Sequence, residues 1–379
     1  MRQPVDAATG APVAGGDYDT AMAATARRPV TFAEIIIDGL PQGVRVPVTG
    51  GRISWSRTRL HQAEGSLEWG IGTPPDPTIV PGAPGTLIQV GVTELRVWSG
   101  LVLADGRVAV CSLGYFSVED YTFTDGMTVT VTLGARSQRV SRARLEAPVQ
   151  WTTGMVLEEA VSGMLNVAWP DVDVEIVGDT HTAPALVHET QTDPWEACTA
   201  AATSKGCWLY PTGDGRFRWT PEPTLDPTTD AAVFAAGVNL TALARTATID
   251  GFSNRAIASS SKPDLTAPVF GQATLTDPGS AARYDGPIGK IPRWYSSPLI
   301  DTTAEAATTA ATILRADRPA DQLRWSAPVD ARLELVDACR VTHPGMWIDQ
   351  TTFVDDIEFD VAGDLMGCSA GAVEEVVEG

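Results

Sequence analysis

The sequence of 379 residues predicts a mainly β protein in which two small antiparallel β-barrels flank an α+β unit. Residues 30–150 and 226–379 contain short β-prone runs separated by turns rich in Gly and Pro, which is typical of small barrels. Residues 151–225 instead combine helical and strand patterns and form a unit of helix, strand, helix and hairpin. Residues 1–29 are polar and rich in small residues, so we expect a flexible N-terminal arm.

The first β region contains closely spaced strand patterns. Residues 30–38 form a β-prone run that ends in a turn at Gly39. Further strands are expected at 52–56, 87–90, 95–98 and 128–132. The stretch 70–85 is dense in Pro and Gly and is expected to be a projecting loop.

A basic segment follows these strands, with four arginines in nine residues: Arg136, Arg139, Arg142 and Arg144. On an acidic protein, such a segment could dock a negatively charged neighbour. A solvated surface segment is the other interpretation, and it is the commoner origin of a charge cluster.

The α+β unit begins with an amphipathic helix at 153–165. Val172, Val174 and Ile176 then alternate with Asp171, Asp173 and Glu175, as expected of a half-buried strand.

The clearest local signals lie between Thr192 and Trp219. Asp193 is a predicted helix N-cap and Pro194 suits the first helical position. The Ala-rich helix continues to Lys205, and Gly206 is expected to end it with a positive φ. An aromatic hairpin follows, with strands at 207–210 and 216–219. This module contains no evident catalytic group.

The second β region has strand candidates at 244–249 and 254–259. Thr302 and Glu305 form a capping box that predicts a helix to about residue 316. The last predicted strands are at 323–326, 333–341 and 353–361.

Composition excludes several functional classes. The chain has 47 acidic and 27 basic residues and a net charge of −20, which disfavours binding to nucleic acid or to anionic membranes. No apolar run approaches the roughly 20 residues of a membrane-spanning helix, and no secretory signal is evident. The five cysteines are widely spaced and odd in number, as expected of small buried hydrophobic residues in a reducing compartment. Pairing of Cys198 with Cys207 remains open.

Several motifs approach catalytic or metal-binding patterns without completing them. Gly367, Ser369 and Gly371 match a nucleophile elbow, but no histidine follows the serine. His188 and Glu189 begin like a zinc-protease helix that lacks its second histidine at position 192.

Acidic residues also occur in groups. Asp171, Asp173 and Glu175 have the spacing of a calcium loop but lack its glycine, so a solvated strand face is expected. The cluster Asp355, Asp356, Glu358 and Asp360 includes alternate residues that share one side of a strand, as on an exposed face.

These patterns single out no catalytic, cofactor-binding or metal-binding residue, and we expect no enzymatic activity. His181 and His188 are interpreted as ordinary polar residues. Exposed tryptophans on a β scaffold could bind sugars, but core packing is the better interpretation for most of the eleven: Trp55, Trp98, Trp208, Trp219 and Trp325 lie in strand patterns.

The helix-hairpin module resembles a stretch found in phage tail-tip and baseplate hub proteins, a family that includes tail-associated hub and minor tail proteins. The similar features are D-P-W-E, the Ala-rich helix, the glycine, the aromatic strand and G-D-G-R-F-R-W. A second similar stretch is A-A-T-I-L-R-A followed by L-E-L-V-D-A-C-R-V. There Leu333, Leu335 and Asp337 match a strand that enters the second barrel of the family. The resemblance covers most of residues 30–365.

The resemblance implies a homotrimer that adapts a sixfold tail tube to a threefold tip and closes or lines the DNA channel, with DNA only as passing cargo. It implies a location at the virion tail tip, after assembly in the bacterial host cytoplasm, without membrane insertion. The expected partners are a distal tail protein, a tape-measure protein and tip or receptor-binding proteins, and lytic activity is expected from another protein. The alternative is a carbohydrate-binding or glycan-cleaving tail protein that uses exposed Trp and paired carboxylates.

Overall fold

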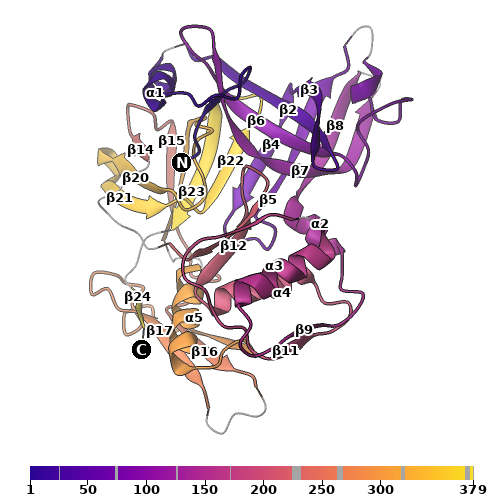
Figure 1. Ribbon diagram of the computed structural model, residues 1–379. Coiled ribbons are helices and arrows are strands. Elements are labelled where there is room, and N and C mark those ends of the chain that lie inside the picture. The colour runs from indigo at the N-terminus through magenta and orange to yellow at the C-terminus, as the bar shows by residue number, and fades with distance from the viewer. Residues whose placement is uncertain are drawn as a thin grey trace.

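The computed structural model describes residues 1–24, 26–72, 76–124, 127–170, 172–223, 232–262, 268–316, 321–371 and 376–378. This part of the chain is mainly β with five α-helices, so the predicted fold class is confirmed. A large sheet occupies one end of the molecule, a layer with helices α2–α4 lies below it, and α5 with a small sheet forms the opposite end (Figure 1).

The large sheet has twelve strands in the order β15-β19-β23-β22-β4-β5-β8-β7-β6-β2-β3, with β1 paired to β7, and all its pairs are antiparallel. Its order is an open path, so closure into barrels is not confirmed. The strands are β1 (Val5–Asp6), β2 (Pro29–Ile37), β3 (Leu40–Pro47), β4 (Gly50–Ser56), β5 (Ala63–Gly70), β6 (Glu94–Val102), β7 (Val108–Thr124), β8 (Thr128–Ala135), β15 (Ala242–Ala247), β19 (Asp321–Pro328), β22 (Asp356–Asp360) and β23 (Leu365–Gly371).

Strands from both predicted barrel regions meet in this sheet. Trp55 of β4 pairs with Ile357 of β22, and both side chains are buried in one hydrophobic cluster that spans the two regions. The strands alternate in the way that a half-buried sheet requires: Ile53 and Trp55 face the core, whereas Ser54 lies on the other face.

The α+β unit contains α2 (Arg136–Arg142), β9 (Val149–Trp151), α3 (Leu157–Ala168), β10 (Val174–Ile176), β11 (Leu186–His188), α4 (Pro194–Ser204), β12 (Cys207–Pro211) and β13 (Phe217–Pro221). The predicted cap of α4 is confirmed, because the Asp193 carboxylate accepts hydrogen bonds from the amides of Trp195 (2.9 Å) and Glu196 (3.2 Å). Gly206 ends the helix with φ of +67°, as predicted.

A four-stranded sheet backed by a helix forms the third unit, which the sequence patterns do not predict. Its order is β18-β16-β17-β24, with α5 (Thr303–Ala316) packed on one face. The predicted capping box is present: the Glu305 amide donates to Thr302 Oγ1, and the Thr302 amide donates to the Glu305 carboxylate, each at 3.1 Å. The strands are β16 (Arg255–Ser260), β17 (Phe270–Leu275), β18 (Pro292–Ser297) and β24 (Val376–Glu378).

Small residues allow this helix to lie very close to its sheet. Ala306 and Ala310 of α5 are fully buried against Ala258 and Ala273. At Gly271 a methyl group would lie 2.2 Å from the Ala307 nitrogen, so only glycine fits there. A last small sheet contains β14 (Ala232–Ala235), β20 (Ala338–His343) and β21 (Ile348–Phe353).

The expected flexible arm is instead packed against the large sheet. Strand β1 pairs with β7, and helix α1 (Gly15–Ala23) buries Tyr18 completely. Arg2 reaches across to donate to the carbonyls of Ala331 (3.2 Å) and Leu333 (2.7 Å). The prediction of a loose arm is therefore wrong for residues 1–24. Their apolar residues are scattered and follow no helix or strand period, so the sequence pattern does not show that they pack against the large sheet.

Two other expectations differ from the structure. The described residues of the stretch 70–85 do not form a projecting loop. The Trp69 indole donates to the Ile79 carbonyl at 3.1 Å, and Ile71, Ile79 and the nearby Ile88 are buried in the main core. Residues 87–90 form no strand.

The predicted strand at 333–341 begins only at Ala338. Leu333 and Leu335 lie in turns before it, although both are buried, and Val336 has a positive φ of 58° that a strand cannot contain. Among the described residues, no helix has the length and apolar character to cross a membrane.

Replacing glycine by alanine should have opposite effects on the free energy of unfolding at two positions, because only one of them lies where α5 approaches its sheet closely. Gly271→Ala would push α5 away from β17 and should lower the free energy of unfolding by about 2–3 kcal/mol. Gly163→Ala in α3 meets nothing within 4 Å and should raise it by roughly 0.5–1 kcal/mol, because alanine favours helix. Urea unfolding of both variants checks this, and equal effects would contradict the packing described.

An ion pair between α4 and α5 predicts a pH dependence. The buried Lys205 ammonium contacts the Glu305 carboxylate at 2.5 Å. Burial raises the pKa of Glu305, but the hydrogen bonds from Lys205 and from the amides of Asp301 and Thr302 outweigh it and hold that pKa below its ordinary value of 4.5. The ionised Glu305 carboxylate therefore stabilises the fold fully above pH 4.5. This stabilisation is lost as the pH falls through the pKa that Glu305 has in the folded protein, which is the lower one.

Glu305→Gln should accordingly lower the free energy of unfolding by about 2 kcal/mol at pH 7, because Lys205 loses its counter-ion. The difference from the parent protein should shrink in thermal unfolding below pH 4.5. Glu159→Gln, at an exposed position in the first turn of α3, is the control and should change little. A difference that persists unchanged at low pH would argue against the role of this pair.

Candidate functional site

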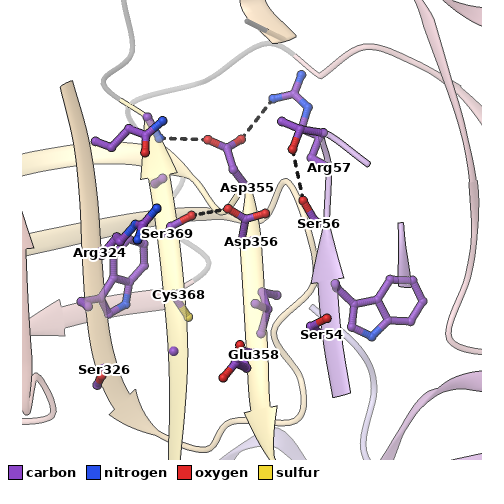
Figure 2. A pocket seen from close by; sticks show the side chains of 18 of the residues that line it. Ser54, Ser56, Arg57, Arg324, Ser326, Asp355, Asp356, Glu358, Cys368 and Ser369 are labelled. Carbon is purple, nitrogen blue, oxygen red and sulfur yellow. Dashed lines mark hydrogen bonds and ion pairs between the residues drawn. The ribbon is translucent and has the colours of Figure 1, made fainter. Parts of the chain in front are cut away.

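A groove with a volume of about 730 Å³, which we call the main groove, lies on the polar face of five neighbouring strands, β15, β19, β23, β22 and β4 (Figure 2). The strand register builds its floor as two rows. One row runs Ser56, Asp356, Ser369, Arg324 and Ala244, and the other runs Ser54, Glu358, Gly367, Ser326 and Ala242.

Side-chain size explains why this face is hollow. Most floor positions hold serine, alanine or glycine, which leave space above the sheet, whereas the residues between them point to the core and are large. Trp55, Ile357 and Trp325 are among these buried neighbours. The alternation of the strands therefore makes one face a packed core and the other an open polar surface.

The carboxylates of the groove have partners in the protein. Asp356 accepts a hydrogen bond from Ser369 Oγ at 2.5 Å (Figure 2), and Glu358 forms an exposed ion pair with Arg52 at 3.4 Å. The nucleophile-like Ser369 lies within β23, not at a turn from a strand to a helix, and no histidine lines the groove. The predicted carboxylate cluster is thus a polar strand face in which Asp356 and Glu358 line the groove and the side chains of Ile357 and Phe359 are buried.

A charged cluster closes one end of the groove. Arg57 follows β4, and its guanidinium forms ion pairs with the Glu222 carboxylate and with Asp355 Oδ1, the latter at 3.5 Å (Figure 2). Asp355 also accepts from the Gly371 amide at 2.9 Å. Only 9% of the Arg57 side chain and 7% of the Glu222 side chain are exposed. Because Glu222 follows β13, this cluster ties the α+β unit to the large sheet.

Burial shifts the pKa values of this cluster. Burial raises the pKa of the Asp355 carboxyl, and the Arg57 charge and the Gly371 amide only partly oppose it. Burial likewise lowers the pKa of Arg57, against the effect of Asp355. The buried charges of this cluster are therefore stabilised by pairing with one another rather than by hydration. Sequence patterns could not find it, since Arg57, Glu222 and Asp355 come from three distant segments.

A second cavity, of about 670 Å³, lies on the other side of Arg57. It is lined by parts of all three units, including Gln62 after β4, Trp208 of β12, Thr312 of α5 and Tyr295 of β18. The seam between the units is thus incompletely filled.

The basic segment at 136–144 is paired within the protein. Arg136 binds Glu94 at 2.7 Å, Arg142 contacts Glu119, and Arg144 lies 3.3 Å from Asp193. Arg139 lies over the Trp169 ring at 4.3 Å. These arginines hold α2 to its surroundings.

The remaining candidates also have structural partners. His181 Nδ1 lies 2.6 Å from Glu158, and His188 packs edge-on against Trp151. Asp173 and Glu175 form ion pairs with Arg216 and Arg218, while Asp171 lies outside the described residues. No group of three metal-binding side chains occurs among the described residues.

All five cysteines are buried, and Cys198 and Cys207 are not joined by a disulfide. Burial raises the pKa of Cys207 to about 11 and that of Cys111 to about 12, so both thiols stay protonated near neutral pH.

The buried cluster predicts a large effect of losing Arg57. Arg57→Met would leave Glu222 buried without its cation, and we expect the free energy of unfolding to fall by about 3 kcal/mol. Arg52→Met, which removes the exposed pair with Glu358, is the control and should stay within about 1 kcal/mol of the parent. Equal losses in urea unfolding would contradict the assignment of Arg57 as the link between the units.

Comparison with known proteins places this geometry in a wider context. No protein-family model and no curated protein sequence matches the chain. Solved structures do match it, at low sequence identity.

The tail protein from Neisseria meningitidis MC58 superimposes with a TM-score of 0.64 at 12% identity, over 91% of this chain and 97% of that one. The 43 kDa tail protein of prophage MuSo2 from Shewanella oneidensis gives a TM-score of 0.59 at 14% identity, over 90% and 98% of the two chains. The E. coli c3393 protein, described as a component of the type VI secretion system with structural similarity to T4 bacteriophage tail proteins gp27 and gp5, gives 0.51 at 11% identity, over 90% and 77%. Across about nine-tenths of its length, this chain has the fold of phage tail proteins.

Proposed function

We propose that this chain is a structural hub of a phage tail tip or baseplate. It forms a homotrimer that adapts the sixfold tail tube to a threefold tip and closes or lines the DNA channel. The observation that carries the proposal is the likeness to the Neisseria tail protein, which extends over 91% of this chain and 97% of the other.

The charge of the molecule supports a channel role. A chain with net charge −20 repels the phosphates of DNA, so a lumen lined by such subunits lets DNA pass without retaining it. The basic segment does not offset this repulsion, because Arg136, Arg142 and Arg144 are paired with carboxylates of the same chain.

The described sites support a role in assembly rather than catalysis. The carboxylates Asp356 and Glu358 of the main groove are engaged by Ser369 and Arg52. The groove is an open, mixed-charge surface on a rigid sheet, which suits contact with another protein. We therefore propose a non-enzymatic protein that works through its shape.

The proposed partners are those of a tail tip: a distal tail protein, a tape-measure protein and tip or receptor-binding proteins. In this proposal the chain assembles in the bacterial host cytoplasm and remains in the virion tail. DNA contacts it only during passage.

The proposal predicts a specific oligomer. The purified protein should give a mass three times its chain mass of 40.1 kDa in size-exclusion chromatography with light scattering. Electron microscopy should show a ring with threefold symmetry and a central opening or plug, because a closed ring is the arrangement that caps a tube. A monomer at every concentration, with no ring in the images, would overturn the proposal.

A further inference from the structure

The small sheet that contains β16 and β17 lies with α5 at one end of the molecule (Figure 1). Its outer face carries exposed aromatic side chains. In the strand register, Ile257 pairs with Trp294 of β18 on one side and with Gln272 of β17 on the other, and Ser259 pairs with Phe270. Directly paired residues point to the same side of a sheet. Trp294, Ile257 and Phe270 therefore lie on one face, which we call the Trp294 patch.

The opposite face of this sheet is already filled. Gly271 and Ala273 of β17 alternate with Phe270, and they face α5. The aromatic residues of the patch thus point away from the helix. Trp294 is 70% exposed and Phe270 is 57% exposed, which is unusual for side chains that bury so much apolar area in a core.

Part of the outer face is covered by the chain itself. The Arg255 guanidinium lies over the Tyr284 ring at 4.5 Å, and Lys290 approaches the same ring at 4.9 Å. Tyr284 belongs to the long connection between β17 and β18, so this loop shields one end of the face. Within the described ranges, the other end, with the Trp294 patch, is left open.

The charge of this unit differs from that of the rest of the molecule. Residues 250–316 contain six basic and six acidic residues, and β24 adds Glu378, so the unit carries a net charge of −1, against −20 for the whole chain. Two identical chains repel each other wherever their acidic surfaces meet. This nearly neutral unit is where an acidic surface of a second copy meets the least repulsion.

We infer that the Trp294 patch is a subunit contact of the trimer and packs against an acidic surface of a second copy of this chain. This inference rests on the proposed trimeric hub. A ring of three requires a heterologous contact, in which the patch meets a different surface of the neighbouring copy. Trp294 supplies the apolar anchor, as tryptophan commonly does in interfaces, and β18 is an edge strand of this sheet in the described part of the chain.

The experiment is a dilution series of the full chain in size-exclusion chromatography with light scattering. Trp294→Ser combined with Phe270→Ser should raise the concentration at which the trimer dissociates by at least about tenfold, since exposed aromatic anchors carry much of an interface. Ser296→Glu keeps both rings and adds a negative charge beside them on the same exposed strand face, and it should weaken the trimer as well.

Trp347→Asn is the matched control. Trp347 is 92% exposed but lies at the turn between β20 and β21, in a different sheet, and its positive φ of 52° suits asparagine. This variant should form a trimer at the same concentrations as the parent protein. Thermal unfolding of all variants confirms that they fold, and Ser296→Glu decides the outcome if the double variant does not.

The possible results separate the two proposals. If the parent protein is a trimer and the patch variants dissociate at the same concentration as the parent, the patch is not a subunit contact and the hub proposal stands. Dissociation of Trp347→Asn to the same extent as the patch variants would also overturn the inference, because the effect would not be specific to the patch. A parent protein that stays monomeric overturns the trimer and this contact together.

Discussion

The antiparallel pairing of β4 with β22 is the constraint on which the rest of the molecule depends. It joins strands far apart in the sequence, since Arg52 and Glu358, which form an ion pair across the two strands, are 306 positions apart, and it merges the early and late β regions into one sheet. The same pairing places Trp55 beside Ile357 in the core and sets Asp355 beside Arg57 at the strand ends. Both the main groove and the buried ion cluster therefore follow from one strand register.

The three units are joined by hydrogen bonds and ion pairs together with a few apolar contacts. Most of their buried apolar residues form separate clusters, but Trp208 of β12 packs against the cluster of the large sheet, and Leu299 of the third unit belongs to the cluster of the α+β unit. The Trp195 indole donates to the Leu60 carbonyl at 2.8 Å, and Gln62 donates to the Leu209 carbonyl at 3.3 Å. Such seams resemble the interfaces between domains, where small rotations cost less than they would within a core.

Local signals in the sequence predicted the local structure well. Asp193, Gly206, Thr302 and Glu305 have the capping and turn roles expected of them, because these depend on neighbours within a few residues. Long-range features escaped prediction. The cluster of Arg57 with Glu222 and the docking of the N-terminal segment both depend on contacts between segments far apart in the chain. The exposure of the Trp294 patch was not predicted either, since it depends on how the strands assemble into the sheet.

The long separation between β4 and β22 has a consequence for biosynthesis. A ribosome completes β4 long before β22 emerges, so the apolar side of β4 lacks one neighbour during most of translation. Pairings between such distant segments also slow the search for the native topology. Newly made chains consequently expose the apolar side of β4 until β22 has left the ribosome, and they are vulnerable to aggregation until then.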